Sequence, residues 1–284
     1  MKEKAPLLVR ALLILDRVMS AMWRTSVMVR DETLWAWTSR QGRERTNRAI
    51  YSGLKTYLPG GATFDEGLFE WERVAITSAF FPPSGRILVG AAGGGRELAG
   101  LSKLGYEVVA FEPAPALAAA ARAVASAYPR SQVVSASYAD VVRAMENGTG
   151  PLAPHVCGRE FHGVILGWTS FSYVWREERD VLLKALRALA PRAPVLLSYL
   201  MADDRSEGRM GVMRRGFRRL LRFAGAPALA EPGDGFQPWS GFFQTITPEE
   251  VQSLAERTGY KAAYVKGPPA PHALFVPDCW RGFG

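Results

Sequence analysis

Residues 85–113 constrain the fold of this 284-residue chain more than any other stretch. They begin with an apolar run at 87–89, which is typical of a parallel strand buried on both faces. A loop of small residues at 90–95 follows and ends in three consecutive glycines. Residues 96–104 then carry leucines at helical spacing, and 108–111 form a second apolar run. This order predicts one strand–loop–helix–strand unit with a right-handed crossover.

The glycine loop and the acidic residue after the second strand predict a nucleoside-binding site. Glycine is needed where a backbone turns tightly and where a ligand approaches with no Cβ in the way. Glu112 ends the second strand, at the place where a bound nucleoside presents its ribose hydroxyls. The alternative interpretation is an ordinary β–α turn followed by an unrelated acidic residue.

The loop fits two classes of cofactor. As a dinucleotide fingerprint it would use Gly90, Gly93 and Gly95. A short-chain dehydrogenase would then need a Tyr-x-x-x-Lys pair downstream of the loop. The only such pair, Tyr51 and Lys55, lies upstream of it. This order argues against a short-chain dehydrogenase. A nicotinamide-dependent oxidoreductase stays as the alternative function on the same fold.

The loop instead resembles the glycine motif of class I (Rossmann-like) S-adenosylmethionine (SAM)-dependent methyltransferases. The family's motif positions correspond to Ala91, Gly93 and Gly95, and its ribose-binding acid corresponds to Glu112. The chain departs from this pattern in two places. Alanine replaces the first glycine, and Val89 stands where the family usually has an acidic residue. Valine cannot hold the ammonium group of SAM, so another group must do so.

The resemblance extends over about residues 87–200, because the run at 182–198 is similar to the family's passage from a helix into the fifth strand. It implies an α/β fold with a seven-stranded, doubly wound, mostly parallel sheet whose last strand is antiparallel. Residues 1–84 are expected to form a helical N-terminal extension, and 85–284 the SAM-binding domain. The insertion at 200–246 follows the fifth strand and is expected to lie over the active face as a lid.

Hydrophobic periodicity and helix-end signals place the individual elements. Beyond the first two strands, the expected strands are 132–136, 163–167, 195–199, 260–265 and 272–276. Beyond the helix after the glycine loop, the expected helices are 7–23, 66–80, 115–127, 179–190, 212–224 and 247–259.

The resemblance also implies a set of cofactor-binding residues. In the family the turn after the third strand faces the adenine, so Ser137 or Asp140 would bind its amino group and Tyr138 would stack on it. Asp140 is also compatible with simply capping the next helix. Trp71 and Glu72 are further candidates, because the helix before the first strand flanks the cofactor in the family. The expected cofactor-binding set is Gly90, Ala91, Ala92, Gly93, Gly95, Glu112, Pro113, Ser137, Tyr138, Asp140, Gly167 and Trp168.

The acceptor site is expected to have an aromatic wall. Its predicted residues are Trp168, Ser170, Phe171, Trp239, Phe242 and Phe243. Such a wall would enclose an apolar substrate and attract the cationic sulfonium by cation–π interaction. Methyl transfer can proceed largely by proximity and orientation. Gln244 and Tyr173 are expected to position the acceptor, and His272, Asp203 and Asp204 are further catalytic candidates.

The predicted function is a SAM-dependent methyltransferase (EC 2.1.1) that acts on an oxygen or nitrogen of a small apolar or aromatic molecule. The sequence contains no Asp/Asn-Pro-Pro-Tyr motif, no Pro-Cys motif and no recognisable metal-ligand spacing. These absences disfavour methylation of a nucleobase and predict no metal. A carrier-bound, lipid or RNA acceptor stays as an alternative, and so does a module that binds a nucleoside without chemistry.

The charge of the chain predicts attraction to acidic partners. Its net charge is +8 and its pI is about 9.7. The predicted lid helix presents five arginines on one side, which form either a solvated face or a docking face for an acidic carrier protein: Arg214, Arg215, Arg218, Arg219 and Arg222. Several arginines over 24–48 are interleaved with two tryptophans, Trp35 and Trp37, where a solvated face with aromatic anchors is favoured over nucleic-acid binding.

The remaining composition indicates a cytoplasmic protein without a membrane span. Two cysteines, with no CxxC spacing, fit a reducing compartment. The apolar stretch at 6–18 is interrupted by Arg10, Asp16 and Arg17, which argues against a signal peptide and a transmembrane helix. A homodimer is possible on this sequence, which does not determine the oligomeric state.

Overall fold

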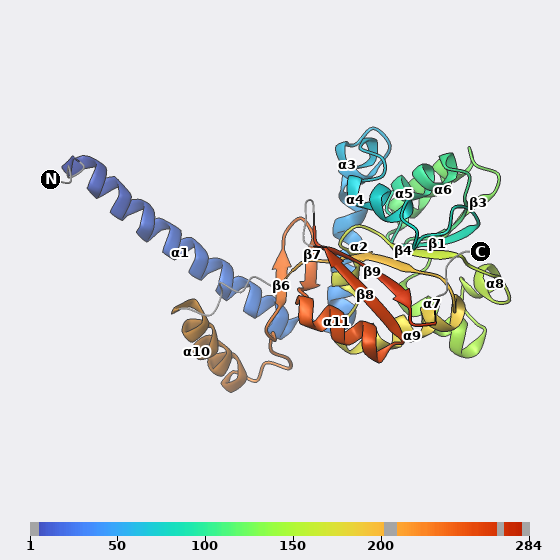
Figure 1. The fold of residues 1–284 in the computed structure, drawn as a ribbon. Coiled ribbons are helices and arrows are strands. Elements are labelled where there is room, and N and C mark those ends of the chain that lie inside the picture. Colours follow the sequence, from blue (N-terminus) through green and yellow to red (C-terminus); the bar gives the residue numbers. More distant parts are fainter. Residues whose placement is uncertain (1–5, 202–208, 266–269, 280–284) are drawn as a thin grey trace. The chain divides into compact units, whose positions relative to one another are not determined.

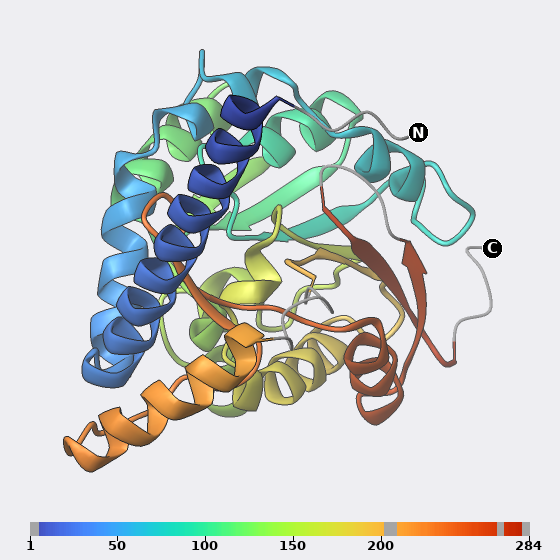
Figure 2. The same ribbon diagram turned by 90° about the vertical axis from the view of Figure 1, so that its left-hand side faces the viewer.

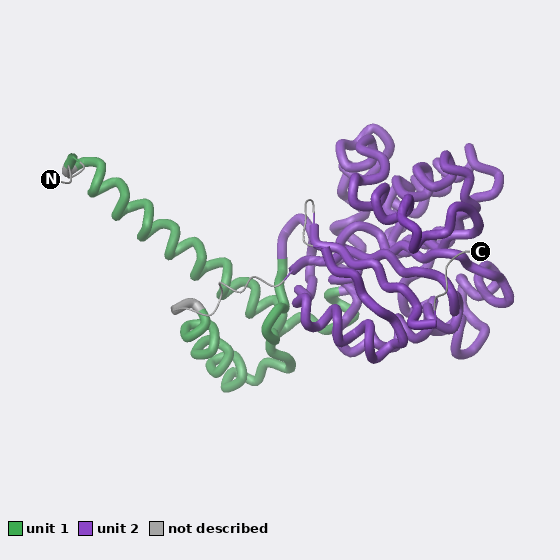
Figure 3. The backbone as a smooth tube through the Cα atoms, in the orientation of Figure 1, with its two compact units in different colours: residues 1–43, 203–236 green, residues 44–202, 237–284 purple. Residues whose placement is uncertain are grey.

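A computed structural model describes residues 6–201, 209–265 and 270–279. The lid candidates Asp203 and Asp204 lie outside the described residues. The chain divides into two compact units (Figure 3). The helical unit comprises residues 1–43 and 203–236, and the sheet unit comprises residues 44–202 and 237–284. Residues 44–84 therefore group with the sheet, whereas the sequence suggested a separate extension over 1–84.

The sheet unit is built on seven strands in the order β3-β2-β1-β4-β5-β9-β8 (Figure 1). Strands β1 to β5 are parallel, and β9 lies antiparallel between β5 and β8. This arrangement confirms the predicted mostly parallel sheet with an antiparallel last strand. The strands are β1 (Arg86–Gly90), β2 (Glu107–Phe111), β3 (Ser131–Val134), β4 (Gly163–Leu166), β5 (Val195–Ser198), β8 (Tyr260–Val265) and β9 (His272–Pro277).

Two clusters of buried apolar side chains cover the two faces of the sheet. One contains Leu88 and Val109 with residues of α7, α9 and α11, and the other contains Ile87 and Val89 with residues of α4 and α5. Neighbouring residues of a strand point to opposite faces, so a strand covered on both faces is apolar throughout. Helices flank the sheet on both sides (Figure 1 and Figure 2). They are α4 (Glu70–Ile76), α5 (Arg96–Lys103), α6 (Pro115–Ala125), α7 (Tyr138–Asn147), α8 (Ala153–Val156), α9 (Arg176–Leu189) and α11 (Pro248–Arg257).

The helical unit contains α1 (Leu7–Trp37) and α10 (Arg209–Phe223). Helix α1 continues well past the predicted end at residue 23. Its second half contacts α10, where Glu32 pairs with Arg218 (2.7 Å) and with Arg214 (3.1 Å). No helix in the described part of the chain combines the length and apolar content that crossing a bilayer requires. The other elements are α2 (Arg40–Gly53), the 3₁₀ helices η1 (Lys55–Tyr57) and η2 (Ser170–Tyr173), α3 (Ala62–Asp65), and a two-stranded sheet of β6 (Asp234–Gln237) and β7 (Gly241–Gln244).

Candidate active site

The order of the strands reverses between β1 and β4. The chain builds β2 and β3 on one side of β1, and β4 and β5 on the other. Ligands of open α/β sheets bind outside the carboxyl ends of the strands at such a reversal. The two strand ends are joined by a hydrogen bond from the N–H of Gly167 to the carbonyl of Gly90 (2.7 Å). A Cβ on Gly167 would lie 2.3 Å from the carbonyl oxygen of Ala91, so this close approach requires glycine.

The glycine loop after β1 is covered on one side and open on the other. Ala91, Gly93 and Gly95 all have positive φ angles (51°, 55° and 97°), so an alanine occupies a conformation that favours glycine. A Cβ on Gly94 would lie 2.1 Å from the carbonyl oxygen of Tyr57 in η1. A Cβ on Gly93 would meet no atom of the described chain closer than 4.0 Å. The loop therefore leaves room for a ligand beside Gly93.

Glu112 lies where β2 ends and is only 4% exposed. Its carboxylate accepts the backbone N–H groups of Gly93 (2.9 Å) and Ala114 (2.8 Å). Burial raises the pKa of Glu112 to about 7, and the two N–H donors oppose that rise. The neighbouring Pro113 is half-buried, and Ala92 within the loop is buried. Glu112 thus holds the end of β2 against the glycine loop.

The turn between β3 and α7 is organised by a helix cap. The Asp140 carboxylate accepts the N–H (2.8 Å) and the hydroxyl (2.9 Å) of Ser137, and it pairs with Arg143 (2.6 Å). The capping interpretation of Asp140 is therefore what the structure shows, and contact with an adenine stays a prediction. The Tyr138 hydroxyl is hydrogen-bonded to that of Ser170 (2.5 Å). This bond ties the turn after β3 to the turn after β4.

The turn after β4 is strained and held by hydroxyl groups. Thr169 has a φ of 54°, which is unusual for a β-branched residue. Its N–H donates to the hydroxyl of Ser198 at the end of β5 (2.7 Å). The Ser172 hydroxyl accepts the N–H of Leu200 (2.8 Å). Phe171 is fully buried in the core with residues of α7 and α9, a place that does not favour its predicted contact with substrate.

A row of seven aromatic rings passes the carboxyl ends of β4 and β5. In order it contains Tyr173, Tyr51, Tyr57, Trp168, Phe69, Trp71 and His272. The centroids of successive rings are 5.5, 5.9, 6.4, 5.2, 6.5 and 4.8 Å apart. Trp168 and Tyr173 follow β4, and His272 lies opposite Ser198, the last residue of β5. The aromatic row therefore lies along the strand ends where the strand order reverses.

Several polar groups of this region lack a protein partner. The indole nitrogens of Trp71 and Trp168 and the hydroxyl of Tyr199 are buried without a hydrogen bond to any described residue. Buried polar groups are nearly always hydrogen-bonded in native proteins, so these three call for a ligand or water. Burial raises the pKa of Tyr173, which keeps its phenol protonated. Burial lowers the pKa of His272, which keeps its imidazole neutral near pH 7.

A buried ion-pair network lies at the start of α5, directly after the glycine loop. Arg96 donates to both carboxylate oxygens of Glu72 (2.6 and 2.7 Å) and to Glu97 (2.6 Å). Its guanidinium carbon lies 3.9 Å from the ring centroid of Phe69. Glu72 also accepts the N–H of Phe69 (2.7 Å), which fixes the first turn of α4. Glu72 thus anchors α4 and holds Phe69 in the aromatic row, and its predicted contact with the cofactor stays a prediction.

Strand β7 contributes structural side chains. The side-chain oxygen of Gln244 accepts the N–H of Arg176 at the start of α9 (2.7 Å). This bond holds the start of α9, and positioning of an acceptor by Gln244 stays a prediction. Phe242 and Phe243 are buried, whereas Trp239 in the preceding turn is 65% exposed. Their predicted contacts with substrate are likewise untested by this geometry.

No family model matches the sequence, and a comparison with curated proteins finds no match. The structure is similar to DhpI in complex with S-adenosylhomocysteine, with a TM-score of 0.52 and 13% identity over 84% of this chain and 98% of DhpI. This chain has the class I SAM-dependent methyltransferase fold. The glycopeptide N-methyltransferase MtfA with S-adenosylhomocysteine matches at 0.49, with 18% identity over 72% of this chain and 88% of MtfA. The sugar N-methyltransferase KedS8 from Streptoalloteichus matches at 0.48, with 15% identity over 73% of this chain and 85% of KedS8.

Within this methyltransferase fold, sequence reasoning located the glycine loop and Glu112 but missed much of the aromatic row. Tyr51, Tyr57 and Phe69 precede β1 and carry no local pattern that separates them from ordinary core or surface aromatics. Arg96 did offer a signal. A charged residue that immediately follows a buried glycine loop must either reach solvent or find a buried partner.

Proposed function

We propose that this protein is a SAM-dependent methyltransferase that binds SAM at the carboxyl ends of β1 and β4. The observation that supports this most is the glycine loop, which is open beside Gly93 and bordered by Glu112. These are the positions that the resembling family uses. The residues present fit a nucleoside, because each carboxylate oxygen of Glu112 has a free lone pair beyond its one backbone donor. The ribose hydroxyls of SAM would donate to it.

The rest of the proposed cofactor site fits a cationic ligand. Val89 is fully buried and offers no carboxylate. The faces of Tyr57 and Trp168, whose centroids are 6.4 Å apart, would instead attract positive charge by cation–π interaction. The unpaired indole N–H of Trp168 would donate to an acceptor atom of the ligand.

In this proposal, the chain's residues orient an acceptor against SAM, which supplies an electrophilic methyl group when bound. The aromatic row excludes water and favours an apolar or aromatic acceptor. Tyr173, kept protonated, donates a hydrogen bond to that acceptor. His272 is neutral and can accept the proton that an acceptor hydroxyl or amine must lose. The group methylated is accordingly an oxygen or a nitrogen.

Calorimetry with SAM, S-adenosylhomocysteine and NADH tests the cofactor. We expect both adenosyl compounds to bind and NADH not to bind. Gly93→Val should abolish binding, because it fills the open side of the loop. Gly105→Val is the matched control, since Gly105 also has a positive φ (93°) and open surroundings but lies at the far end of α5. Binding of NADH alone would contradict the proposal and support an oxidoreductase.

Incubation with SAM and a metabolite extract tests the reaction itself. We expect one apolar or aromatic metabolite to gain the mass of a methylene group while S-adenosylhomocysteine accumulates. Once that acceptor is known, His272→Gln should lower kcat and leave the affinity for SAM unchanged. A protein that binds SAM but never forms S-adenosylhomocysteine would be a binding module instead.

A further inference from the structure

The first half of α1 exposes an unusual amount of apolar surface. Ten large apolar side chains between residues 8 and 23 are at least 42% exposed: Leu8, Val9, Leu12, Leu13, Ile14, Leu15, Val18, Met19, Met22 and Trp23. A helix that is apolar over most of its surface is normally buried in a core or in lipid. Contiguous exposed apolar patches of this kind mark interaction sites.

The basic residues of this segment occupy one narrow side, and its single acidic residue, Asp16, lies about 100° from Arg17 around the helix. Arg10, Arg17 and Arg24 recur every seven residues, which places them in one row because seven residues nearly complete two helical turns. All three are exposed and have no side-chain partner among the described residues. When the residues are ordered by their angle around the helix axis, at about 100° per residue, those from Ala21 to Trp23 are all apolar. They form a continuous arc of about 200°. That arc is much wider than the seam of a two-stranded coiled coil.

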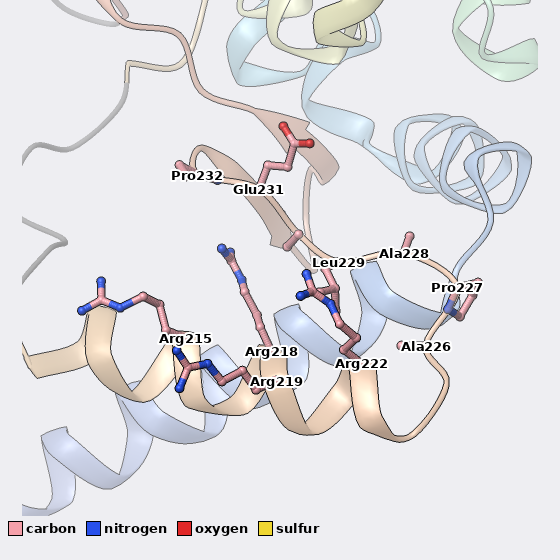
Figure 4. Close-up of a pocket in the computed structure, with 11 residues that line it drawn as sticks. Arg215, Arg218, Arg219, Arg222, Ala226, Pro227, Ala228, Leu229, Glu231 and Pro232 are labelled. Carbon is pink, nitrogen blue, oxygen red and sulfur yellow. The ribbon is translucent and has the colours of Figure 1, made fainter.

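Helix α10 in the same unit repeats this combination. Phe223 is 93% exposed, and Val212 and Leu220 are 61% and 59% exposed. Beside them, Arg215, Arg219 and Arg222 are exposed and make no ion pair with any described residue. Together with Arg218 and one carboxylate, that of Glu231, they line a hollow of about 640 Å³ between α10 and residues 226–232 (Figure 4).

We infer that the helical unit docks on the surface of an anionic lipid bilayer. Helices that lie in a membrane interface have an apolar face with Trp, Phe and Leu and a polar face with Lys and Arg. The first half of α1 has both faces, and α10 pairs its exposed apolar stripe with arginines. The arginine-lined hollow fits the phosphate of a lipid headgroup.

Other partners match these surfaces less well. An acidic protein or a nucleic acid would complement the arginines, but interfaces with nucleic acid are strongly polar and leave the wide apolar arc uncovered. A second copy of the chain would cover the arc but would leave the arginines of α1 and α10 without an anionic partner. Only a bilayer offers acyl chains and anionic headgroups side by side. This inference does not depend on the proposed function, because docking is measured without turnover.

Flotation of the full chain with vesicles tests the apolar arc. The vesicles contain phosphatidylcholine alone or phosphatidylcholine with an equal part of phosphatidylglycerol. Leu12→Gln with Met19→Gln places two polar groups on the arc, and Leu13→Gln with Ser20→Gln places two on the arginine side at the same spacing. Glutamine keeps helix propensity in both pairs. We expect the arc pair to weaken binding to anionic vesicles at least about tenfold and the control pair less than about threefold.

A second comparison tests the arginines of α10. Changing Arg215, Arg219 and Arg222 together to glutamine should weaken binding to anionic vesicles by about a hundredfold and flatten its salt dependence. The control changes three exposed arginines of the sheet unit to glutamine, Arg130, Arg159 and Arg192, and should have little effect although the net charge falls equally.

Three results would overturn the inference. The first is that the parent protein floats with neither kind of vesicle, and the second is that the arc pair and the control pair weaken binding equally. The third is a dimer in light scattering that the arc pair dissociates, with no vesicle binding, which would mean that a second copy covers α1. Circular dichroism on every variant establishes that each retains its helices.

Discussion

Helices α5 and α1 place the same kinds of side chain in opposite environments. In α5, Leu98 and Leu101 are fully buried, and Arg96 is buried in ion pairs with two glutamates. In the first half of α1, Leu12 and Leu15 are each 56% exposed. An amphipathic helix is stabilised mainly by burying its apolar face, and α5 buries its own against the sheet. The first half of α1 therefore contributes little burial to the fold, and its apolar surface is available to a partner.

The largest expected effect comes from breaking the charge network of α5. Arg96→Ala leaves Glu72 and Glu97 buried without their cation, and we expect a loss of about 3–5 kcal/mol in the free energy of unfolding, measured with urea. Arg73→Ala is the matched control. Arg73 pairs with Glu70 at 2.7 Å, but both side chains are more than half exposed, so we expect less than about 1 kcal/mol. Similar losses in both variants would mean that burial of the network does not stabilise the sheet unit.

A second large effect should appear as a pH dependence at Glu112. Its pKa is raised from 4.5 to about 7 in the folded chain, so the folded state holds its proton more tightly than the unfolded state does. Stability from this group is present below pH 4.5 and is lost as the pH rises to about 7. Relative to the parent, Glu112→Gln should therefore gain on the order of 3 kcal/mol between these limits. A constant difference in unfolding free energy across this range would show that the carboxylate is not buried as described.

A smaller effect should follow from relieving strain in the glycine loop. Ala91 has a φ of 51°, a conformation that costs an alanine about 1–2 kcal/mol and a glycine little. Glycine also loses more conformational freedom on folding, so we expect Ala91→Gly to stabilise the chain by about 0.5–1 kcal/mol. Ala92→Gly is the control, because Ala92 is buried and has no positive φ, and it should destabilise. The melting temperatures of the two variants should shift in opposite directions from that of the parent. A shift in the same direction would show that Ala91 is not strained.

The fold could be predicted because the inner strands β1, β2, β4 and β5 are covered on both faces and are therefore largely apolar. Element ends were less predictable, since contacts distant in sequence decide them. The predicted helix at 66–80 is only Glu70–Ile76, because Glu72 caps the first turn while it binds Arg96. Helix α1 was expected to end near residue 23 and runs to Trp37, because Glu32 pairs with arginines of α10.

The candidate site was predictable only where backbone geometry restricts the residue type. The glycine loop was predictable because a tight turn and a close backbone approach require glycine at Gly93 and Gly95, whose contact with a cofactor stays a prediction. Tyr51 and Tyr57 were not predicted as site residues. No local sequence pattern indicates that α2 and η1 contact the turn after β4. Aromatic rings gathered from separate elements leave no periodic trace in one segment.

The smallest expected effect tests the exposed surface of α1. Leu12→Ala should change the free energy of unfolding by less than about 0.5 kcal/mol, because Leu12 is 56% exposed and alanine is the strongest helix former. Leu101→Ala removes the same atoms from a fully buried position in α5 and should cost about 2–5 kcal/mol. Urea unfolding in dilute, lipid-free solution compares the two variants. If Leu12→Ala costs as much as Leu101→Ala, then α1 buries its apolar arc within the chain or in a second copy. In that case its apolar surface is part of the folded core, and the contrast between the two helices does not hold.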